Sequence, residues 1–194
     1  AILGASQARI GSSVTAAYAV DGKPGSELLV GSAEASIGGP NRGRVSLLTM
    51  WPSPPRTYCT AKQNSLGCTP FIHSTGTPGA GAGSAFRVRA SNMLNNVTGV
   101  LIYGYDANAA PFQGGTLCVS TPIRRTSGQV TGGTPPPTKD CSGTFDHDFA
   151  ALIQAGTDPA LTLGRQVFCQ YWSRDKQSPS GTNLSNGLAF LINP

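Results

Sequence analysis

Charged side chains are scarce in this chain, at 12% of 194 residues against roughly 25% in an ordinary soluble domain. Hydrophobic residues still account for 39%, so the composition excludes the highly charged disordered class and predicts a folded core. No segment approaches the roughly 18 consecutive apolar residues of a membrane span, and we therefore expect no such span.

Histidine and glutamate occur only twice each, which restricts the catalytic options. Nucleophile-elbow, phosphate-loop and HExxH motifs are absent, and both glutamates lie in the first 50 residues. In Asp146-His147-Asp148 a histidine has carboxylate neighbours, but adjacent strand residues point to opposite faces, so only the two aspartates would share a side. We predict no catalytic residue, metal or cofactor, and keep a hydrolase using Asp146 and His147 as a third hypothesis.

The net charge of +5 makes nucleic acid a partner to consider. The basic residues are scattered, however, with Arg42/Arg44, Arg87/Arg89 and Arg124/Arg125 as the only compact groups. Neither a basic helix nor an aromatic-plus-basic stacking motif is evident in the sequence. We expect no nucleic-acid partner.

Glycine and proline are abundant, with 25 and 15 residues, and both are unfavourable in helices. Strand-like runs alternate with turn clusters from Tyr58 onward, which predicts an all-β fold with an antiparallel β-sandwich over residues 58–194. A Pro-rich linker over residues 51–57 separates it from residues 1–50. The expected strands lie near residues 58–62, 69–74, 84–91, 97–105, 116–121, 143–149, 165–172 and 186–192.

Two segments carry clear periodicities. Phe86, Val88 and Ala90 alternate with polar residues, which predicts a strand with one face in the core. Only Asp148 to Ala155 has helical spacing, so we expect little helix.

Four of the five cysteines form two short-range pairs bracketed by turns, Cys59 with Cys68 and Cys118 with Cys141. We interpret both pairs as disulfides; zinc is the rival, but CxxC is absent and the histidines lie outside ligand-like spacing. Cys169 remains unpaired in a strand-like run, as a buried thiol or as one half of an intersubunit bridge.

Residues 8–50 resemble one FG-GAP repeat, the four-stranded blade unit of integrin-type β-propellers. The resemblance rests on Ile10-Gly11, Leu28 to Ala33 and Gly43-Arg44-Val45. It implies an amino-terminal blade-like β extension. The calcium loop keeps only Asp21, and one carboxylate cannot supply the 6 to 8 oxygens that calcium prefers, so we predict no calcium.

A single blade leaves strand edges without partners. Those edges can dock on the same chain or pair with a neighbouring molecule by strand addition, and both routes remain open. A candidate donor strand has alternating Val14, Ala16, Tyr18 and Val20.

The larger segment resembles an uncharacterised, Cys-containing carboxy-terminal domain of secreted bacterial proteins. The matching motifs are Tyr58 to Cys68, Pro111 to Val119, Gln170 to Asp175 and Leu184 to Leu188. The resemblance implies secretion and a β-rich fold but no activity. The chain also begins at Ala1, as after removal of a signal peptide, so we expect an extracellular or cell-surface location.

The leading hypothesis is a secreted structural subunit that assembles with itself, head to tail, into a filament or surface layer by strand donation. The alternative is a non-catalytic module that binds surface glycans, for which Trp172, Tyr171, Tyr103 and Tyr105 are either a sugar platform or core residues. Two sequons, at Asn96 and Asn183, are possible glycosylation sites.

Overall fold

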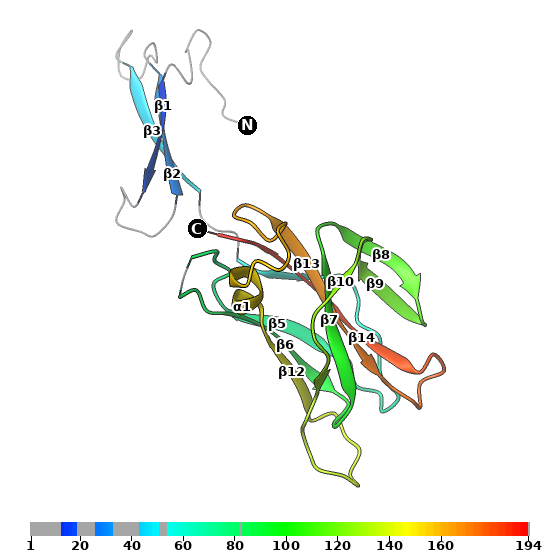
Figure 1. Cartoon of the computed structure of the whole chain (residues 1–194). Coiled ribbons are helices and arrows are strands. Elements are labelled where there is room, and N and C mark those ends of the chain that lie inside the picture. The colour runs from blue at the N-terminus through cyan, green and yellow to red at the C-terminus, as the bar shows by residue number, and fades with distance from the viewer. Residues whose placement is uncertain (1–12, 19–25, 33–42, 51–53, 82, 194) are drawn as a thin grey trace. The chain divides into compact units, whose positions relative to one another are not determined.

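A computed structural model of the chain describes residues 13–18, 26–32, 43–50, 54–81 and 83–193 (Figure 1). The chain divides into two compact units, Ala1–Pro52 and Ser53–Pro194. Strands predominate among the described residues of both, as predicted, and each of their sheets is antiparallel. No helix of this described part is long and apolar enough to cross a membrane.

The amino-terminal unit contains a three-stranded sheet in the order β1-β2-β3. The strands are β1 (Ser13–Tyr18), β2 (Ser26–Ser32) and β3 (Arg44–Met50). The candidate donor strand is therefore paired along one side within its own chain. Val20 and Asp21, named above for the donor strand and the calcium loop, lie outside the described residues.

The second unit is a sandwich of two sheets with a hairpin on the outer side of one of them (Figure 1). The larger sheet has the order β10-β7-β13-β14-β4, with β11 also pairing with β7, and the smaller sheet has the order β12-β6-β5. The hairpin is β8-β9. The bounds are β4 Arg56–Tyr58, β5 Phe71–Gly76, β6 Phe86–Met93, β7 Thr98–Gly104, β8 Ala107–Phe112, β9 Gly115–Val119, β10 Arg124–Arg125, β11 Gln129–Val130, β12 Gly143–Asp148, β13 Gln166–Arg174 and β14 Thr182–Leu191.

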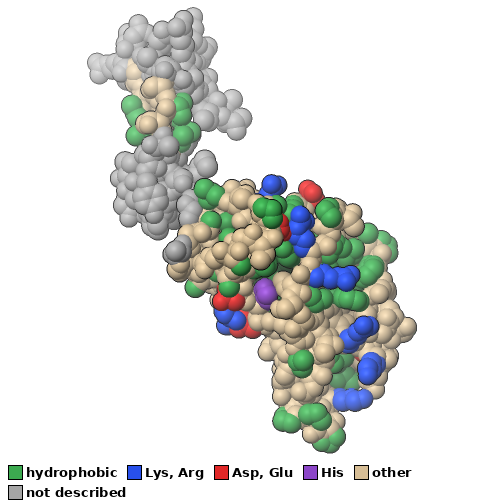
Figure 2. Space-filling model, viewed as in Figure 1, with side chains coloured by type: hydrophobic (Ala, Val, Ile, Leu, Met, Phe, Trp, Pro, Cys, Tyr) green, Lys and Arg blue, Asp and Glu red, His purple; other side chains and the backbone are tan. Residues whose placement is uncertain are grey.

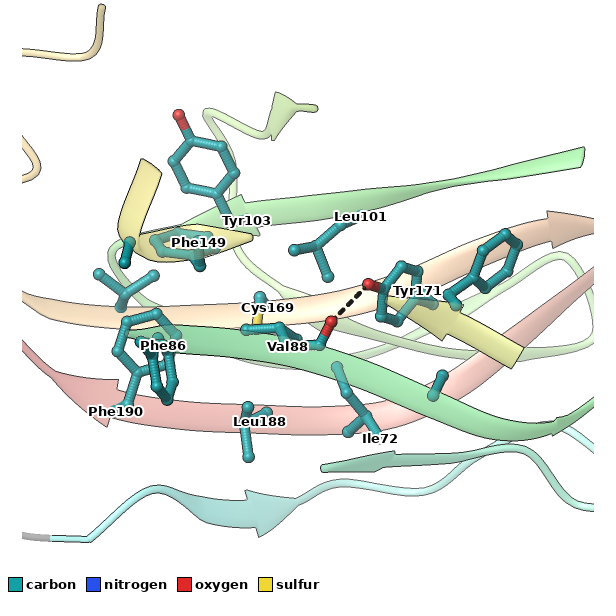
Figure 3. Close-up of a cluster of buried hydrophobic side chains, with 14 of the residues drawn as sticks. Ile72, Phe86, Val88, Leu101, Tyr103, Phe149, Cys169, Tyr171, Leu188 and Phe190 are labelled. Carbon is teal, nitrogen blue, oxygen red and sulfur yellow. Dashed lines mark hydrogen bonds between the residues drawn. The ribbon is translucent and has the colours of Figure 1, made fainter. Parts of the chain in front are cut away.

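The core lies between the two sheets (Figure 3). Phe86, Val88 and Ala90 are buried in it, which confirms the alternation predicted for this strand. They meet side chains such as Tyr171 and Phe190 from the larger sheet. Burying such side chains stabilises by about 1.5–3 kcal/mol each, so this contact holds the two sheets together.

The helix α1 (Phe149–Gln154) agrees with the predicted segment. Asp148 is its N-cap, because its carboxylate accepts from the backbone N–H of Ala151 at 3.0 Å. Phe149 and Ile153 are buried in the core, which explains the apolar spacing in the sequence.

The four predicted disulfide cysteines are bonded, but the predicted pairing is wrong: the bonds are Cys59–Cys118 and Cys68–Cys141. The error came from assuming closure between sequence neighbours. The turn before Cys68 is instead closed by hydrogen bonds, since Asn64 N–H donates to the Cys68 carbonyl at 2.9 Å and Asn64 Oδ1 accepts from Cys68 N–H at 3.0 Å. The sulfurs instead bond cysteines 59 and 73 residues away in sequence, of which Cys118 lies in β9 and Cys141 lies just before β12.

Several strands also differ from expectation: the strand expected near residues 58–62 is β4, which ends at Tyr58, and β8, β10 and β11 were not expected. Arg56 and Thr57, predicted in the linker, belong to β4 and pair with Ala189 and Leu188 of β14. Strand β8 was not predicted, because its sequence ANAAPF lacks β-branched residues and includes proline. Strand β8 forms because it pairs with β9, although its own residues have low strand propensity.

Candidate functional site

Trp172 lies on the outer face of the larger sheet, opposite the core. Its neighbour Tyr171 is fully buried between the sheets, whereas Trp172 is partly exposed. Further along the same strand Gln170 is buried beneath the β8-β9 hairpin, where its amide donates to the Thr116 carbonyl at 2.9 Å. The tip of the hairpin is formed by Gln113 and Gly114, and Trp172 beside it is partly exposed.

The tip of the hairpin holds the indole ring in place. Gln113 Oε1 accepts from Trp172 Nε1 at 3.0 Å and from the Thr182 hydroxyl at 2.7 Å. Gln113 and Gly114 both have positive φ, 47° and 73°, as a two-residue type I′ turn requires. The turn geometry therefore aims the Gln113 amide at the ring.

Lys62 fixes the hairpin tip in turn. Its ammonium donates to the Gln113 carbonyl at 2.9 Å and to the Thr182 carbonyl at 2.7 Å. It also contacts the hydroxyls of Ser178 and Ser180 at 2.8 and 2.5 Å. This one cation thus joins the hairpin, strand β14 and the loop before it beside Trp172.

Two arginines lie beside the indole. The guanidinium carbons of Arg125 and Arg174 are 5.7 and 5.8 Å from the ring centroid, within cation–π range. Both side chains are exposed. In the described part of the chain, neither forms an ion pair with a carboxylate.

A cavity of about 430 Å³ opens at the end of the sandwich, and its lining does not include Trp172. A depression of about 160 Å³, lined by Trp172, shares Thr98 and Arg174 with it, so the two hollows are adjacent. We call these two adjacent hollows together the Trp172 groove. The cavity alone lies in the range of roughly 300–1,000 Å³ typical of ligand sites, and the depression at the ring lies below it.

The far wall of the groove is a proline-rich loop held by Asn95. The buried amide of Asn95 donates to the carbonyls of Thr134 and Thr138 at 2.7 and 2.8 Å. Its oxygen accepts from the N–H of Asp140 at 3.0 Å, and the Cys68–Cys141 disulfide closes the loop base. The loop thus has fixed anchors on both sides of its prolines.

The groove carries more positive than negative charge. Arg174, Lys176 and Lys139 line the cavity, and all three are exposed. The one lining carboxylate, Asp175, is 1% exposed and accepts backbone hydrogen bonds from Ser65 and Ser178 at 2.8 and 3.2 Å. Figure 2 shows Lys and Arg side chains spaced down this flank of the sandwich. Three cations therefore face solvent, while the carboxylate faces inward.

The Asp146-His147-Asp148 segment is not assembled as a catalytic pair. Both aspartates bond to Arg87, at 2.6 and 3.2 Å, so they share the outer face as predicted. Burial raises the pKa of Asp146, but hydrogen bonds from Arg87 and Arg89 outweigh this and hold it below its usual value. His147 packs near Phe149 instead, and burial lowers its pKa.

The four aromatic candidates do not form one platform. Tyr103 and Tyr171 are core residues, and Tyr103 and Tyr105 donate to Asp158 at 3.0 and 2.6 Å. Burial raises the pKa of both hydroxyls, and their bonds to the carboxylate add to this, so both stay protonated donors. Only Trp172 of the four reaches the groove.

The remaining predicted positions divide between surface and interior. Asn96 is exposed and lines the groove, and its glycosylation stays a prediction. Asn183 is 1% exposed and its amide nitrogen donates to the Lys62 carbonyl at 3.0 Å, so glycosylation there does not fit the folded protein. Cys169 is a buried free thiol, and burial raises its pKa.

Sequence reasoning missed the arginines of the groove. The alternation of Trp172 and Arg174 along one strand was a usable signal, because residues two apart share a face. The position of Arg125 beside the ring could not be predicted from the sequence, because it depends on the pairing of β10 with β7. Across the described residues, no group of three or more His, Cys, Asp or Glu is arranged to hold a metal. Comparison of the chain with protein-family models, curated proteins and solved structures found no match.

Proposed function

We propose that this chain is a secreted, non-catalytic module that binds surface glycans through the Trp172 groove. The observation that carries the proposal is a partly exposed indole, fixed by Gln113, on the outer face of the larger sheet. Aromatic rings with one apolar face and one anchored polar end are well suited to stacking on sugar rings. Secretion is supported by the two disulfides, which persist in oxidising compartments.

The absence of catalysis is part of the proposal. The carboxylates nearest a histidine are engaged by Arg87 and Arg89, and the groove carboxylate Asp175 is held by backbone donors. A carboxylate held in this way is a poor general base, because its lone pairs are occupied.

Affinity electrophoresis through gels containing soluble polysaccharides tests the proposal. We expect retardation of the native protein by at least one polysaccharide, and loss of that retardation in Trp172→Ala. Phe71→Ala is the matched control, because Phe71 is an exposed aromatic, 47% exposed, on the other sheet. Full retardation of Trp172→Ala, or no retardation by any polysaccharide, contradicts the proposal.

A second candidate function, self-assembly, is favoured by the amino-terminal sheet. Within the described residues β1 and β3 are edge strands, and they carry exposed Val14 and Val45, 56% and 71% exposed. Pairing β1 of one copy with β3 of the next gives an open, head-to-tail assembly. The FG-GAP resemblance supports this reading, since blades of that kind normally have neighbours on both sides.

Light scattering and electron microscopy of the full chain test this second candidate. We expect filaments or large assemblies, and we expect Val14→Lys to dissolve them because edge lysines oppose strand pairing. A monomer of the native chain at every concentration refutes assembly by this route.

A further inference from the structure

We infer that the ligand of the Trp172 groove is an acidic polysaccharide, whose carboxylate or sulfate groups bind Arg125, Arg174 and Lys176 while a sugar ring packs on Trp172. This inference rests on the proposed function and names the class of glycan. It follows from the cationic side chains beside the indole ring, which have no carboxylate partner among the described residues.

The two arginines at the ring lack anionic partners. Elsewhere in the sandwich Arg87 and Arg89 bind Asp146, and Arg124 binds Asp158 at 2.6 Å. The exposed Arg56 and Arg165 also have no ion pair within the described residues, so what distinguishes Arg125 and Arg174 is their shared position beside the indole. Arg125 and Arg174 contact only the indole among the described interactions. Guanidinium groups bind carboxylates and sulfate-like anions in a planar, bidentate manner, so these two are available for a ligand.

The register places the two arginines on either side of the ring. Arg125 pairs with Ile102, which pairs with Gln170, whereas Arg174 lies two residues beyond Trp172. The indole therefore has one cation from β10 and one from β13 beside it. A sugar ring packed on the indole can present acidic groups to both.

The cavity extends the same charge pattern beyond Arg174. Lys176 and Lys139 line it, and the Asp175 carboxylate is turned inward to backbone donors. The Asp175 carboxylate reduces the net positive charge of the groove. Because it is buried, it does not contact an anion that binds at the surface. The groove therefore favours a chain of anions over a neutral glycan.

Single-stranded nucleic acid is the main competing polyanion. Grooves that bind it stack successive bases on several rings, whereas the Trp172 groove contains one indole. The other ring with stacked arginines, Tyr105, has its hydroxyl bonded to Asp158 and its neighbour Arg124 in an ion pair. The two disulfides support a location in an oxidising compartment, such as the cell surface or the extracellular space, where glycans occur.

The test titrates the full chain with polygalacturonate, dextran sulfate, neutral dextran and a thymidine oligonucleotide, at low and high salt. We expect at least one acidic polysaccharide to bind about tenfold or more tighter than dextran, with affinity falling as salt increases. Polygalacturonate carries carboxylates and dextran sulfate carries sulfates, so comparing the two shows which acidic group the groove binds. Oligonucleotide binding as tight as the best polysaccharide overturns the inference.

Charge variants locate the binding. Arg174→Gln and Arg125→Gln should each weaken acidic-polymer binding about five- to tenfold, because each removes a charge-assisted hydrogen bond at the surface. Arg56→Gln is the control with the same change in net charge. Arg56 pairs with Ala189, seven residues along β14 from the partner of Arg174, or roughly 23 Å at 3.3 Å per residue.

The outcomes separate the two claims. Dextran binding that Trp172→Ala abolishes and the arginine variants leave unchanged overturns the acidic class but keeps the glycan site. If Arg56→Gln weakens acidic-polymer binding as much as Arg125→Gln and Arg174→Gln do, and Trp172→Ala leaves it unchanged, both the acidic class and the glycan site are overturned. Binding of that kind depends on net charge alone.

Discussion

Replacing Tyr171 with phenylalanine removes one hydroxyl from the centre of the sandwich. The hydroxyl donates to the Val88 carbonyl at 2.8 Å (Figure 3). It thus connects β13 of the larger sheet to β6 of the smaller one. The ring itself stays in place, because it stacks on Phe145 at 4.8 Å.

The expected loss follows from that contact. A buried hydrogen bond contributes about 0.5–1.5 kcal/mol net, and a buried backbone group left without a partner costs about 1–3 kcal/mol. We therefore expect Tyr171→Phe to lower the free energy of unfolding by about 2 kcal/mol. For a chain of this size that corresponds to a fall of about 4–8 °C in Tm.

Thermal and urea denaturation, followed by circular dichroism, measure this difference. Tyr105→Phe is the control, because it also removes a tyrosine hydroxyl but leaves Asp158 bonded to Tyr103, Arg124 and the Ala160 N–H. We expect the control to lose less than about 1 kcal/mol. Equal losses in both variants, or no loss in Tyr171→Phe, would refute the reasoning about the core.

Three further predictions test other parts of the structure. Peptide mapping without reduction should find Cys68 linked to Cys141, and a Cys59–Cys68 peptide contradicts the fold. Replacing both Cys68 and Cys141 with serine should lower the free energy of unfolding by about 4 kcal/mol, because the disulfide bridges a separation of 73 residues. Burial lowers the pKa of His147 from 6.5, so the unfolded chain binds a proton at a higher pH than the folded chain does. The free energy of unfolding should therefore fall as pH drops below about 6.5. In urea titrations His147→Asn should make this decline less steep, and an unchanged decline contradicts the assignment to His147. Gly99→Ala should destabilise by about 1–3 kcal/mol, because an added Cβ would meet the Phe145 ring; unchanged stability would show that the ring can move.

Local sequence patterns predicted the elements that bury a periodic face. The alternation around Val88 identified β6, and the spacing after Asp148 identified α1, because burial imposes a period of 2 on a strand and 3.6 on a helix. Strand β8 lacked that signal, since its residues are small and mostly exposed. Its place depends on pairing with β9.

Features that depend on contacts distant in sequence were not predicted. The disulfide pairing was one, because which cysteines meet depends on the packing of β9 and β14 rather than on loop length. The groove was another. Trp172 was recognised as a candidate, but its exposure depends on where the hairpin stops, and its arginine neighbour Arg125 comes from another strand.

A fluorescence titration of a Trp51→Phe variant tests the central claim most directly. The chain has two tryptophans, Trp51 and Trp172, so this variant reports from Trp172 alone. We predict a saturable change in emission on addition of an acidic polysaccharide, absent with dextran and weakened by Arg174→Gln. Binding that is detected by another method but leaves the Trp172 emission unchanged would show that glycans bind elsewhere and would contradict the account.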